Sequence, residues 1–245
     1  KVLMKWADLI EANALELAVL GVRDNGTEIG MAIKAEPGSA AGTIRYYAEA
    51  LDKIYGEIAP TSSDILGMIH KEPVGVVGAI IPWNFPMMIG AWKLGPALAM
   101  GNSVVLKPSE TASLSLMRMC DLALEAGLPA GVLNYVSGEG AVVGEVLGLS
   151  MDVDVLVFTG SGVTGRRLME YAARSNMKRV YLELGGKSPN IIFADAPNLD
   201  EAAKVAAGGI FRNSGQVCVA GSRLLVEASI HDDFVAAVAK ATQAM

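Results

Sequence analysis

Short apolar runs alternate along most of the chain with longer segments in which apolar residues recur three and four positions apart. The short runs are rich in β-branched residues and predict strands, whereas the longer spacing predicts amphipathic helices. Strands are expected at Val74–Ile81, Ser103–Leu106, Val132–Val136, Val153–Phe158, Arg179–Leu184 and Asn190–Phe193. Helices are expected between them at Met87–Met100, Ser113–Ala126, Ala141–Leu147 and Gly162–Ala173.

Nearly continuous apolar strands separated by helices are typical of strands buried on both faces of a sheet. This pattern predicts the α/β class, with a doubly wound parallel sheet built from right-handed βαβ units. Helical spacing also predicts one helix near residues 9–20 and another near 44–54. After Gly186 the alternation resumes with a helix, a strand and a final helix, so we place a domain boundary there. A second α/β unit is therefore expected to start at that point.

The segment between Glu72 and Lys93 carries no charged side chain. It is long enough for a membrane span, which needs about 20 apolar residues. Pro82 and Pro86 lie in its middle, however, and each removes a backbone donor and clashes with the preceding helical turn. We therefore predict a buried strand, a loop and a helix here, and no membrane partner.

The composition is that of a folded globular chain. Of its 245 residues 52% are hydrophobic and 19% charged, with a formal net charge of −6. No run of Lys or Arg is present, so nucleic acid is not an expected partner. Two cysteines and two histidines are too few for a zinc site or a disulfide framework, which favours a cytoplasmic protein without a metal centre. The chain starts at Lys1 and ends within a predicted helix, as expected of a fragment.

A glycine-rich loop, Gly160–Gly165, follows a predicted strand and opens a predicted helix. Small residues let the backbone approach a pyrophosphate, and the helix start presents unpaired N–H groups to it. We interpret the loop as a dinucleotide site, the alternative being a tight turn without a ligand. Glu183, about 20 residues further on, could bind the ribose hydroxyls. Lys107 and Glu110 after another strand could do so instead, unless they mark a solvated helix start.

Three further residues could carry chemistry. Cys218 lies in a small polar loop, although a single cysteine is by default an inert buried thiol. Asn84 lies on a proline-bracketed loop at a strand end, where its amide could donate to a developing oxyanion. Glu183 ends an apolar strand, where burial would raise the pKa of its carboxyl towards that of a useful base.

The sequence resembles the aldehyde dehydrogenase superfamily. The resemblance rests on the motifs PWNFP at 82–86, LKPSE at 106–110, FTGS at 158–161, LELGGKSPN at 182–190 and GQVC at 215–218. They stand in the family's order and at near-family spacing over almost the whole chain. Within the family, the chain is similar to bacterial dehydrogenases of γ-aminobutyraldehyde-type substrates, including γ-glutamyl-γ-aminobutyraldehyde and 4-guanidinobutyraldehyde.

The resemblance implies a mechanism in which an aldehyde is oxidised to a carboxylic acid with NAD. Cys218 would attack the aldehyde, Asn84 and the Cys218 N–H would hold the oxyanion, and Glu183 would activate the water that hydrolyses the thioester. This assigns Glu183 to catalysis instead of ribose binding. The implied cofactor-binding residues are Ile81, Pro82, Trp83, Lys107, Ser109, Glu110, Gly160, Ser161, Gly165, Leu184 and Gly185. A carboxylate at Glu110 would repel a 2′-phosphate, so NAD is expected in preference to NADP.

The resemblance also implies the domain plan and the assembly. Residues 1–185 would form a Rossmann-like NAD-binding domain with part of an oligomerisation hairpin near 56–72, and residues 186–245 the N-terminal part of a catalytic domain. A homodimer or homotetramer would follow. Phe85, Ile89 and Trp92 are candidates for an aldehyde tunnel, or simply pack one helix. The family usually has Thr or a larger residue at Gly162.

Two alternatives to an acid-forming enzyme stay open. One is a relative of the same superfamily that passes the thioester to coenzyme A, or a semialdehyde dehydrogenase; retention of Glu183 favours hydrolysis by water. The other is a catalytically incompetent truncated or structural protein that reuses the fold.

Overall fold

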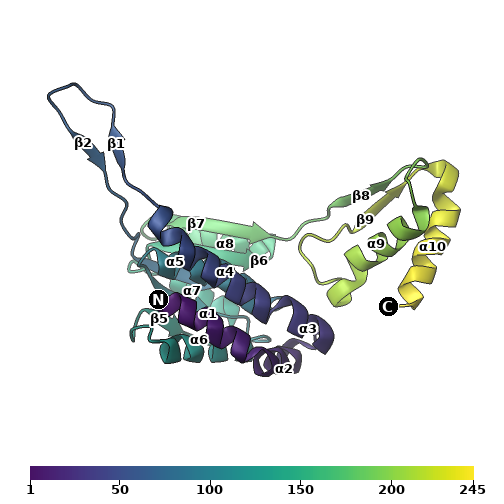
Figure 1. The fold of residues 1–245 in the computed structure, drawn as a ribbon, viewed down its shortest axis with the longest axis horizontal. Helices are drawn as coiled ribbons and strands as arrows, with labels where there is room; N and C mark the ends of the chain where they lie inside the picture. The colour runs from purple at the N-terminus through teal and green to yellow at the C-terminus, as the bar shows by residue number, and fades with distance from the viewer. The chain divides into compact units, whose positions relative to one another are not determined.

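The computed structural model describes residues 1–245, which form two compact units, Lys1–Glu183 and Leu184–Met245. The first unit is built on a five-stranded parallel sheet with the strand order β5-β4-β3-β6-β7 (Figure 1). Its strands are β3 Val76–Ile80, β4 Ser103–Lys107, β5 Leu133–Tyr135, β6 Val155–Gly160 and β7 Arg179–Leu184. The α/β class and the parallel sheet are thus confirmed.

The chain starts this sheet in its centre and winds outward in both directions. From β3 it moves through β4 to β5, and then crosses back to place β6 on the other side of β3. In the register, Val77 pairs with Val104 on one side and with Val155 on the other. The order therefore reverses between β3 and β6, and open α/β sheets bind ligands outside the carboxyl ends of the strands at such a point.

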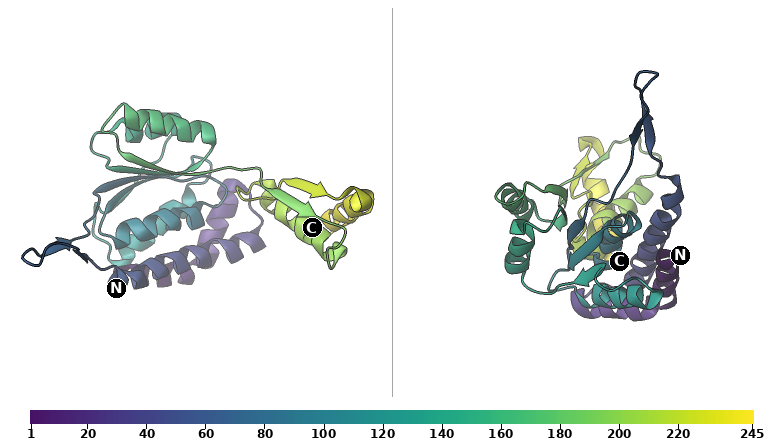
Figure 2. Two further views of the ribbon diagram at one scale, coloured as in Figure 1. Left: turned by 90° about the horizontal axis from the view of Figure 1, so that it is seen from above. Right: turned by 90° about the vertical axis from the view of Figure 1, so that its left-hand side faces the viewer.

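Helices cover both faces of the sheet, as Figure 2 shows. Two helices, α5 and α6, lie on one face, and two others, α7 and α8, lie on the opposite face. Their bounds are α5 Pro86–Ala99, α6 Leu114–Ala126, α7 Gly140–Leu149 and α8 Gly162–Ala173. Helix α5 starts with Pro86 in its first turn, where the missing N–H costs nothing. The core between sheet and helices includes the fully buried Leu94, Leu106 and Leu116.

An outer layer of N-terminal helices packs on α5 and α6. It consists of α1 Val2–Ala12, α2 Ala14–Asn25, α3 Ile29–Ala35 and α4 Pro37–Ala50, followed by a 3-10 turn at Leu51–Lys53. Trp6 anchors this layer, because its buried Nε1 donates to the carbonyl oxygen of Met119 at 2.9 Å. The single helix expected near residues 9–20 is wrong in one respect, since the structure has two helices that meet at Asn13. Asn13 departs from helical backbone geometry, with φ −107° and ψ 22°, and its Nδ2 donates to the Leu9 carbonyl at 2.8 Å.

A short antiparallel hairpin projects from the body of the first unit (Figure 1). Strand β1, Glu57–Ala59, pairs with β2, Gly67–Ile69, and Ile58 lies opposite Met68. The structure thus contains a hairpin within the expected 56–72 segment. Its apolar side chains Ile58, Leu66 and Met68 are each more than 70% exposed.

The second unit is a small α/β arrangement. Strand β8, Pro189–Ile192, pairs in parallel with β9, Arg223–Val226. Helices α9, Leu199–Phe211, and α10, His231–Gln243, pack against each other. No helix in either unit is long and apolar enough to cross a membrane.

Candidate active site

A cavity of about 780 Å³ opens at the carboxyl ends of β3, β4 and β6, where the strand order reverses. Its walls combine the ends of these strands with one side of α7 and of α8. Most of the expected cofactor-binding residues line it, namely Ile81, Pro82, Trp83, Lys107, Ser109, Glu110, Gly160 and Ser161. Segments far apart in the sequence are therefore brought together here by the sheet topology.

Lys107 and Glu110 form an ion pair in the wall of the cavity. Lys107 is only 2% exposed, and its Nζ lies 2.9 Å from Oε2 of Glu110. Hydrogen bonds from the Glu110 backbone N–H and from Lys107 lower the pKa of the Glu110 carboxyl, with a smaller contribution from the N–H of Gly140. Glu110 is thus a carboxylate at neutral pH, able to accept hydrogen bonds from hydroxyl groups in the cavity.

The start of α8 forms a second wall of the cavity. Ser161 caps this helix, because its Oγ accepts the N–H of Thr164 at 3.2 Å. A Cβ atom at Gly160 would lie 2.5 Å from the ring of Phe158, so a larger residue there would force this buried ring to shift. A Cβ at Gly162 would meet nothing within 4 Å. Gly165, in contrast, is buried within α8 and does not line the cavity.

Several lining residues were not predicted from the sequence. Glu139 directly precedes α7, and Glu145 lies within α7. The other three, Thr164, Arg167 and Tyr171, lie on α8. The last three could have been found, because they follow Ser161 at helical spacing of three and four and so share one face of α8. The two glutamates belong to no motif, and only the tertiary fold brings them to the cavity.

Glu183 lies at the end of β7 and is exposed, so the burial expected for it is not found. The reason is its place on an edge strand, where exposed and half-buried residues alternate. Glu183 lines an open groove of about 460 Å³ together with Lys93. Burial lowers the pKa of the Lys93 ammonium to about 8, and the negative charge of Glu183 opposes this effect. Lys93 Nζ also donates to Thr159 Oγ1 at 2.6 Å.

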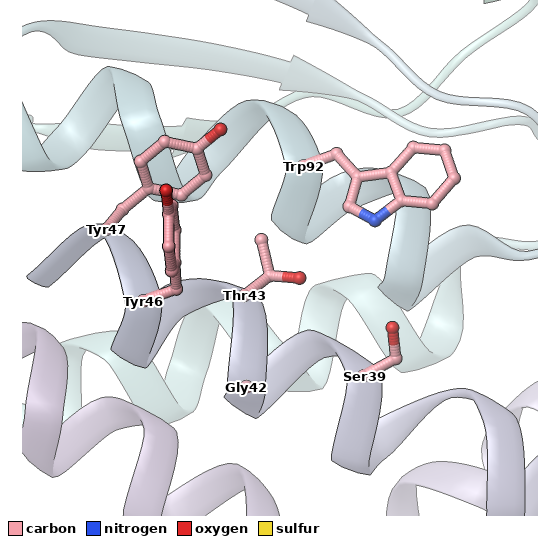
Figure 3. Close-up of a pocket in the computed structure, with 6 residues that line it drawn as sticks. All are labelled: Ser39, Gly42, Thr43, Tyr46, Tyr47 and Trp92. Carbon is pink, nitrogen blue, oxygen red and sulfur yellow. The ribbon is translucent and has the colours of Figure 1, made fainter. Parts of the chain in front are cut away.

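The three candidate tunnel residues differ in burial and in the cavities they line. Phe85 and Ile89 are buried, at 5% and 1% exposure, and line none of these cavities. Trp92 is 43% exposed and lines both the groove of Glu183 and an aromatic cleft of about 490 Å³ between α4 and α5. Figure 3 shows Trp92 in this cleft with Tyr46 and Tyr47, whose rings meet edge to face at 5.2 Å.

Asn84 is half-buried in the loop between Pro82 and Pro86, directly after β3. Both Asn84 and Glu183 belong to the first unit, whereas Cys218 belongs to the second. The two remaining cofactor candidates, Leu184 and Gly185, also lie in the second unit, half-buried and exposed respectively.

Cys218 follows an unusual backbone turn. Asn213, Ser214 and Gly215 have φ angles of 51°, 55° and 75°, in the left-handed region. Such conformations in non-glycine residues are strained and cluster at functional sites. The Cys218 side chain is half-buried in the loop that follows. A Cβ atom at Gly186 would lie 3.6 Å from the Cys218 carbonyl oxygen, so the backbone after β7 approaches the cysteine loop within this unit.

Comparison with known proteins agrees with this architecture. The model of the aldehyde dehydrogenase family matches residues 1–245, and the chain belongs to this family. It is 56% identical over 242 residues to the NADP/NAD-dependent aldehyde dehydrogenase PuuC of Escherichia coli K12, an alignment that covers 99% of this chain and 49% of PuuC.

Two solved structures are similarly close. The γ-glutamyl-γ-aminobutyraldehyde dehydrogenase of Burkholderia cenocepacia J2315 has a TM-score of 0.96 and 51% identity. The indole-3-acetaldehyde dehydrogenase AldA of P. syringae, in complex with NAD⁺ and IAA, has a TM-score of 0.96 and 54% identity. Each match covers 99% of this chain and 49% of the other. The chain thus spans about half the length of these relatives.

Proposed function

We propose that this chain is part of an NAD-dependent dehydrogenase that oxidises an aldehyde to a carboxylic acid. The observation that carries the proposal is the cavity at the strand-order reversal, which gathers the residues of three family motifs. Its volume, its carboxylate beside a buried ammonium and its helix start suit the ribose and pyrophosphate parts of a dinucleotide. Glu110 would bind ribose hydroxyls, and the amides near Ser161 would bind the pyrophosphate. NAD, when bound, supplies the acceptor for the hydride.

The chain's own residues would carry the remaining steps. The Cys218 thiolate forms a C–S bond to the aldehyde carbon, and the carbonyl oxygen becomes an oxyanion. The Asn84 amide and the Cys218 N–H donate hydrogen bonds to this oxyanion. Loss of hydride from the carbon leaves a thioester on Cys218. Glu183 then takes a proton from a water molecule, whose oxygen attacks the thioester and releases the acid and the thiolate.

We favour NAD over NADP because the ionised Glu110 would repel a 2′-phosphate. We favour an amino- or guanidino-aldehyde of amine catabolism as the substrate, supported by the similarity to a γ-glutamyl-γ-aminobutyraldehyde dehydrogenase. The aromatic Trp92 and Tyr46, which line a cleft beside α5, could attract such a cationic group. A kcat/KM panel of γ-aminobutyraldehyde, 4-guanidinobutyraldehyde and propanal in a full-length enzyme tests this preference, and equal values would contradict it.

The decisive experiment separates acid formation from acyl transfer. In a full-length enzyme carrying these residues, Cys218→Ser should abolish NADH formation. Glu183→Gln should retain a single-turnover burst of NADH but lose steady-state turnover, because the thioester forms and is not hydrolysed. Turnover that depends on coenzyme A would instead favour the acylating alternative, and a burst in Cys218→Ser would exclude the cysteine mechanism.

We also propose that the enzyme is a cytoplasmic homo-oligomer. The exposed apolar side chains of the β1–β2 hairpin, Ile58 and Met68 among them, support an interface there. Sedimentation of an Ile58→Lys, Met68→Lys double variant of the full-length enzyme should show smaller assemblies than the wild type. Leu15→Lys, at another exposed apolar position, is the matched control. An unchanged mass for the double variant would place the interface elsewhere.

A further inference from the structure

The loop that carries Asn84 is held by a side chain of the outer helical layer. Asn25, the last residue of α2, donates from Nδ2 to the carbonyl oxygen of Trp83 at 2.9 Å. Its Oδ1 accepts the backbone N–H of Thr27 at 3.0 Å, which fixes the orientation of the Asn25 amide. The Trp83 carbonyl belongs to the peptide group that joins Trp83 to Asn84. Asn25 therefore orients the backbone from which the Asn84 side chain departs.

Glu36 holds the far end of the same loop. Its Oε2 accepts the N–H of Met88 at 2.9 Å, and the backbone of Met87 also donates to this carboxyl. Both N–H groups belong to the first turn of α5, which lacks a side-chain cap from Phe85. First-turn N–H groups have no partner within their own helix, so an acceptor at this position fixes where α5 begins. Glu36 is only 5% exposed and hence rigidly placed.

Asn25 and Glu36 also line the same small cavity. Together with Pro86 and Met87 they line a space of about 10 Å³. Glu36 is the single ionisable residue in its lining. Such a space is about the size of one water molecule. Glu36 Oε1 receives no hydrogen bond from the protein. The two side chains thus form one polar contact region, which we call the loop brace, between the outer helices and the loop at residues 82–86.

We propose that Asn25 and Glu36 are positioning residues that hold Asn84 in place for the oxyanion. This inference rests on the proposed role of Asn84. An oxyanion donor is effective only when it is already in place, and a misplacement of about 1 Å can cost up to about 100-fold in rate. Pro82 and Trp83 are the residues of the braced loop that line the cofactor cavity, whereas Lys107, Glu110 and Ser161 lie outside the loop. Loss of the brace therefore slows the chemical step more than it weakens cofactor binding.

Hydrogen exchange tests the brace without any need for activity. In the 245-residue chain, Asn25→Ala and Glu36→Ala should each speed amide exchange in residues 83–88 by about fivefold or more, since those N–H groups lose their fixed surroundings. Glu36→Gln, which keeps an acceptor oxygen, should restore slow exchange. Asn134→Ala is the matched control, because Asn134 Nδ2 also donates to a main-chain carbonyl, that of Gly131, but at the β5 edge. Unchanged exchange in both alanine variants would overturn the brace.

A double-mutant cycle tests the coupling to Asn84. In a full-length enzyme, Asn25→Ala should slow single-turnover hydride transfer about 10-fold while the Kd for NAD changes by less than about threefold. In an Asn84→Ala background it should have almost no further effect, because the group it positions is gone. An equal loss in both backgrounds, or a loss confined to NAD affinity, would refute a positioning role. A wild-type rate in Asn84→Ala would instead refute the proposed function of Asn84, whatever the exchange result.

Discussion

At the scale of single residues, the surroundings of two carboxyl groups, Glu36 and Glu110, determine their protonation states. Burial raises the pKa of Glu36 to about 7, against hydrogen bonds from Met88 and Met87 that lower it. Glu110, in contrast, is kept ionised by donors around it. At neutral pH the same residue type is therefore about half protonated under the loop, as Glu36, and ionised in the cavity, as Glu110. The difference follows from burial in the first case and from donors in the second.

The stability of the first unit should consequently depend on Glu36 and pH. An acid whose folded pKa is raised binds more protons in the folded state, so its favourable contribution is lost as pH rises from about 4.5 to about 7. The difference in unfolding free energy between wild type and Glu36→Gln should therefore change by about 3 kcal/mol over this window, in favour of Gln at high pH. Urea unfolding followed by tryptophan fluorescence measures it, since Trp6, Trp83 and Trp92 all lie in the first unit. A pH-independent difference would contradict the buried state of Glu36.

Glu110 should control the choice between NAD and NADP. Glu110→Gln removes the negative charge, so the Kd for NADP should fall about tenfold, which corresponds to about 1.4 kcal/mol. The Kd for NAD should rise a few-fold, because a charge-assisted hydrogen bond becomes a neutral one. Titration calorimetry on the 245-residue chain measures both values. Glu125→Gln, in a surface ion pair with Arg118, is the control and should change neither. No gain in NADP affinity would mean that Glu110 does not face the adenosine ribose.

At the scale of elements, the glycine loop between β6 and α8 contains two glycines with opposite requirements. Gly160→Ala should destabilise the first unit by about 1–3 kcal/mol, because the new Cβ would collide with the buried Phe158 ring. Gly162→Ala should stabilise it by about 0.5 kcal/mol, since the site is open and helical and the unfolded chain loses freedom. Urea unfolding curves of the two variants provide each other's control. Equal changes in unfolding free energy for the two variants would show that the Phe158 ring does not pack against Gly160.

Local pattern predicted the sheet elements well and the outer layer less well. The bounds of β7 and α8 coincide with those expected, because apolar residues recur at the strand period in β7 and at the helix period in α8. The break at Asn13 and the short α3 were missed, since one non-helical residue and a seven-residue helix leave no periodic trace in the sequence. At the site, motifs located Lys107 and Ser161. They could not locate Glu139 or show that Glu183 is exposed, because the tertiary fold alone decides both.

At the scale of the whole molecule, the two units differ in how much apolar surface they bury. The first has a sheet covered by helices on both faces. The second has only two parallel strands, and its fully buried residues are few, among them Ala206 and Phe234. Ile191, Phe193 and Leu225 in and beside these strands are about half exposed or more. Parallel strands are normally buried on both faces, whereas these strands keep apolar side chains exposed.

The 245-residue chain should therefore bind the cofactor but turn over aldehyde poorly. The cavity proposed to bind NAD is lined only by residues of the first unit, and we expect NAD to protect amides near Ser161 and Gly140 from hydrogen exchange. Cys218 lies in the second unit, whose amides should exchange fast because little apolar surface shields them. A thiol in a unit with so little buried apolar surface is poorly oriented for attack, so NADH formation should be at least about 100-fold slower than in a relative of full length. Hydrogen exchange measured with and without NAD tests cofactor binding. An NADH assay with γ-aminobutyraldehyde tests turnover. Turnover comparable to that of the full-length relative would show that the second unit is already ordered in this chain, and that its exposed strands need no cover for catalysis.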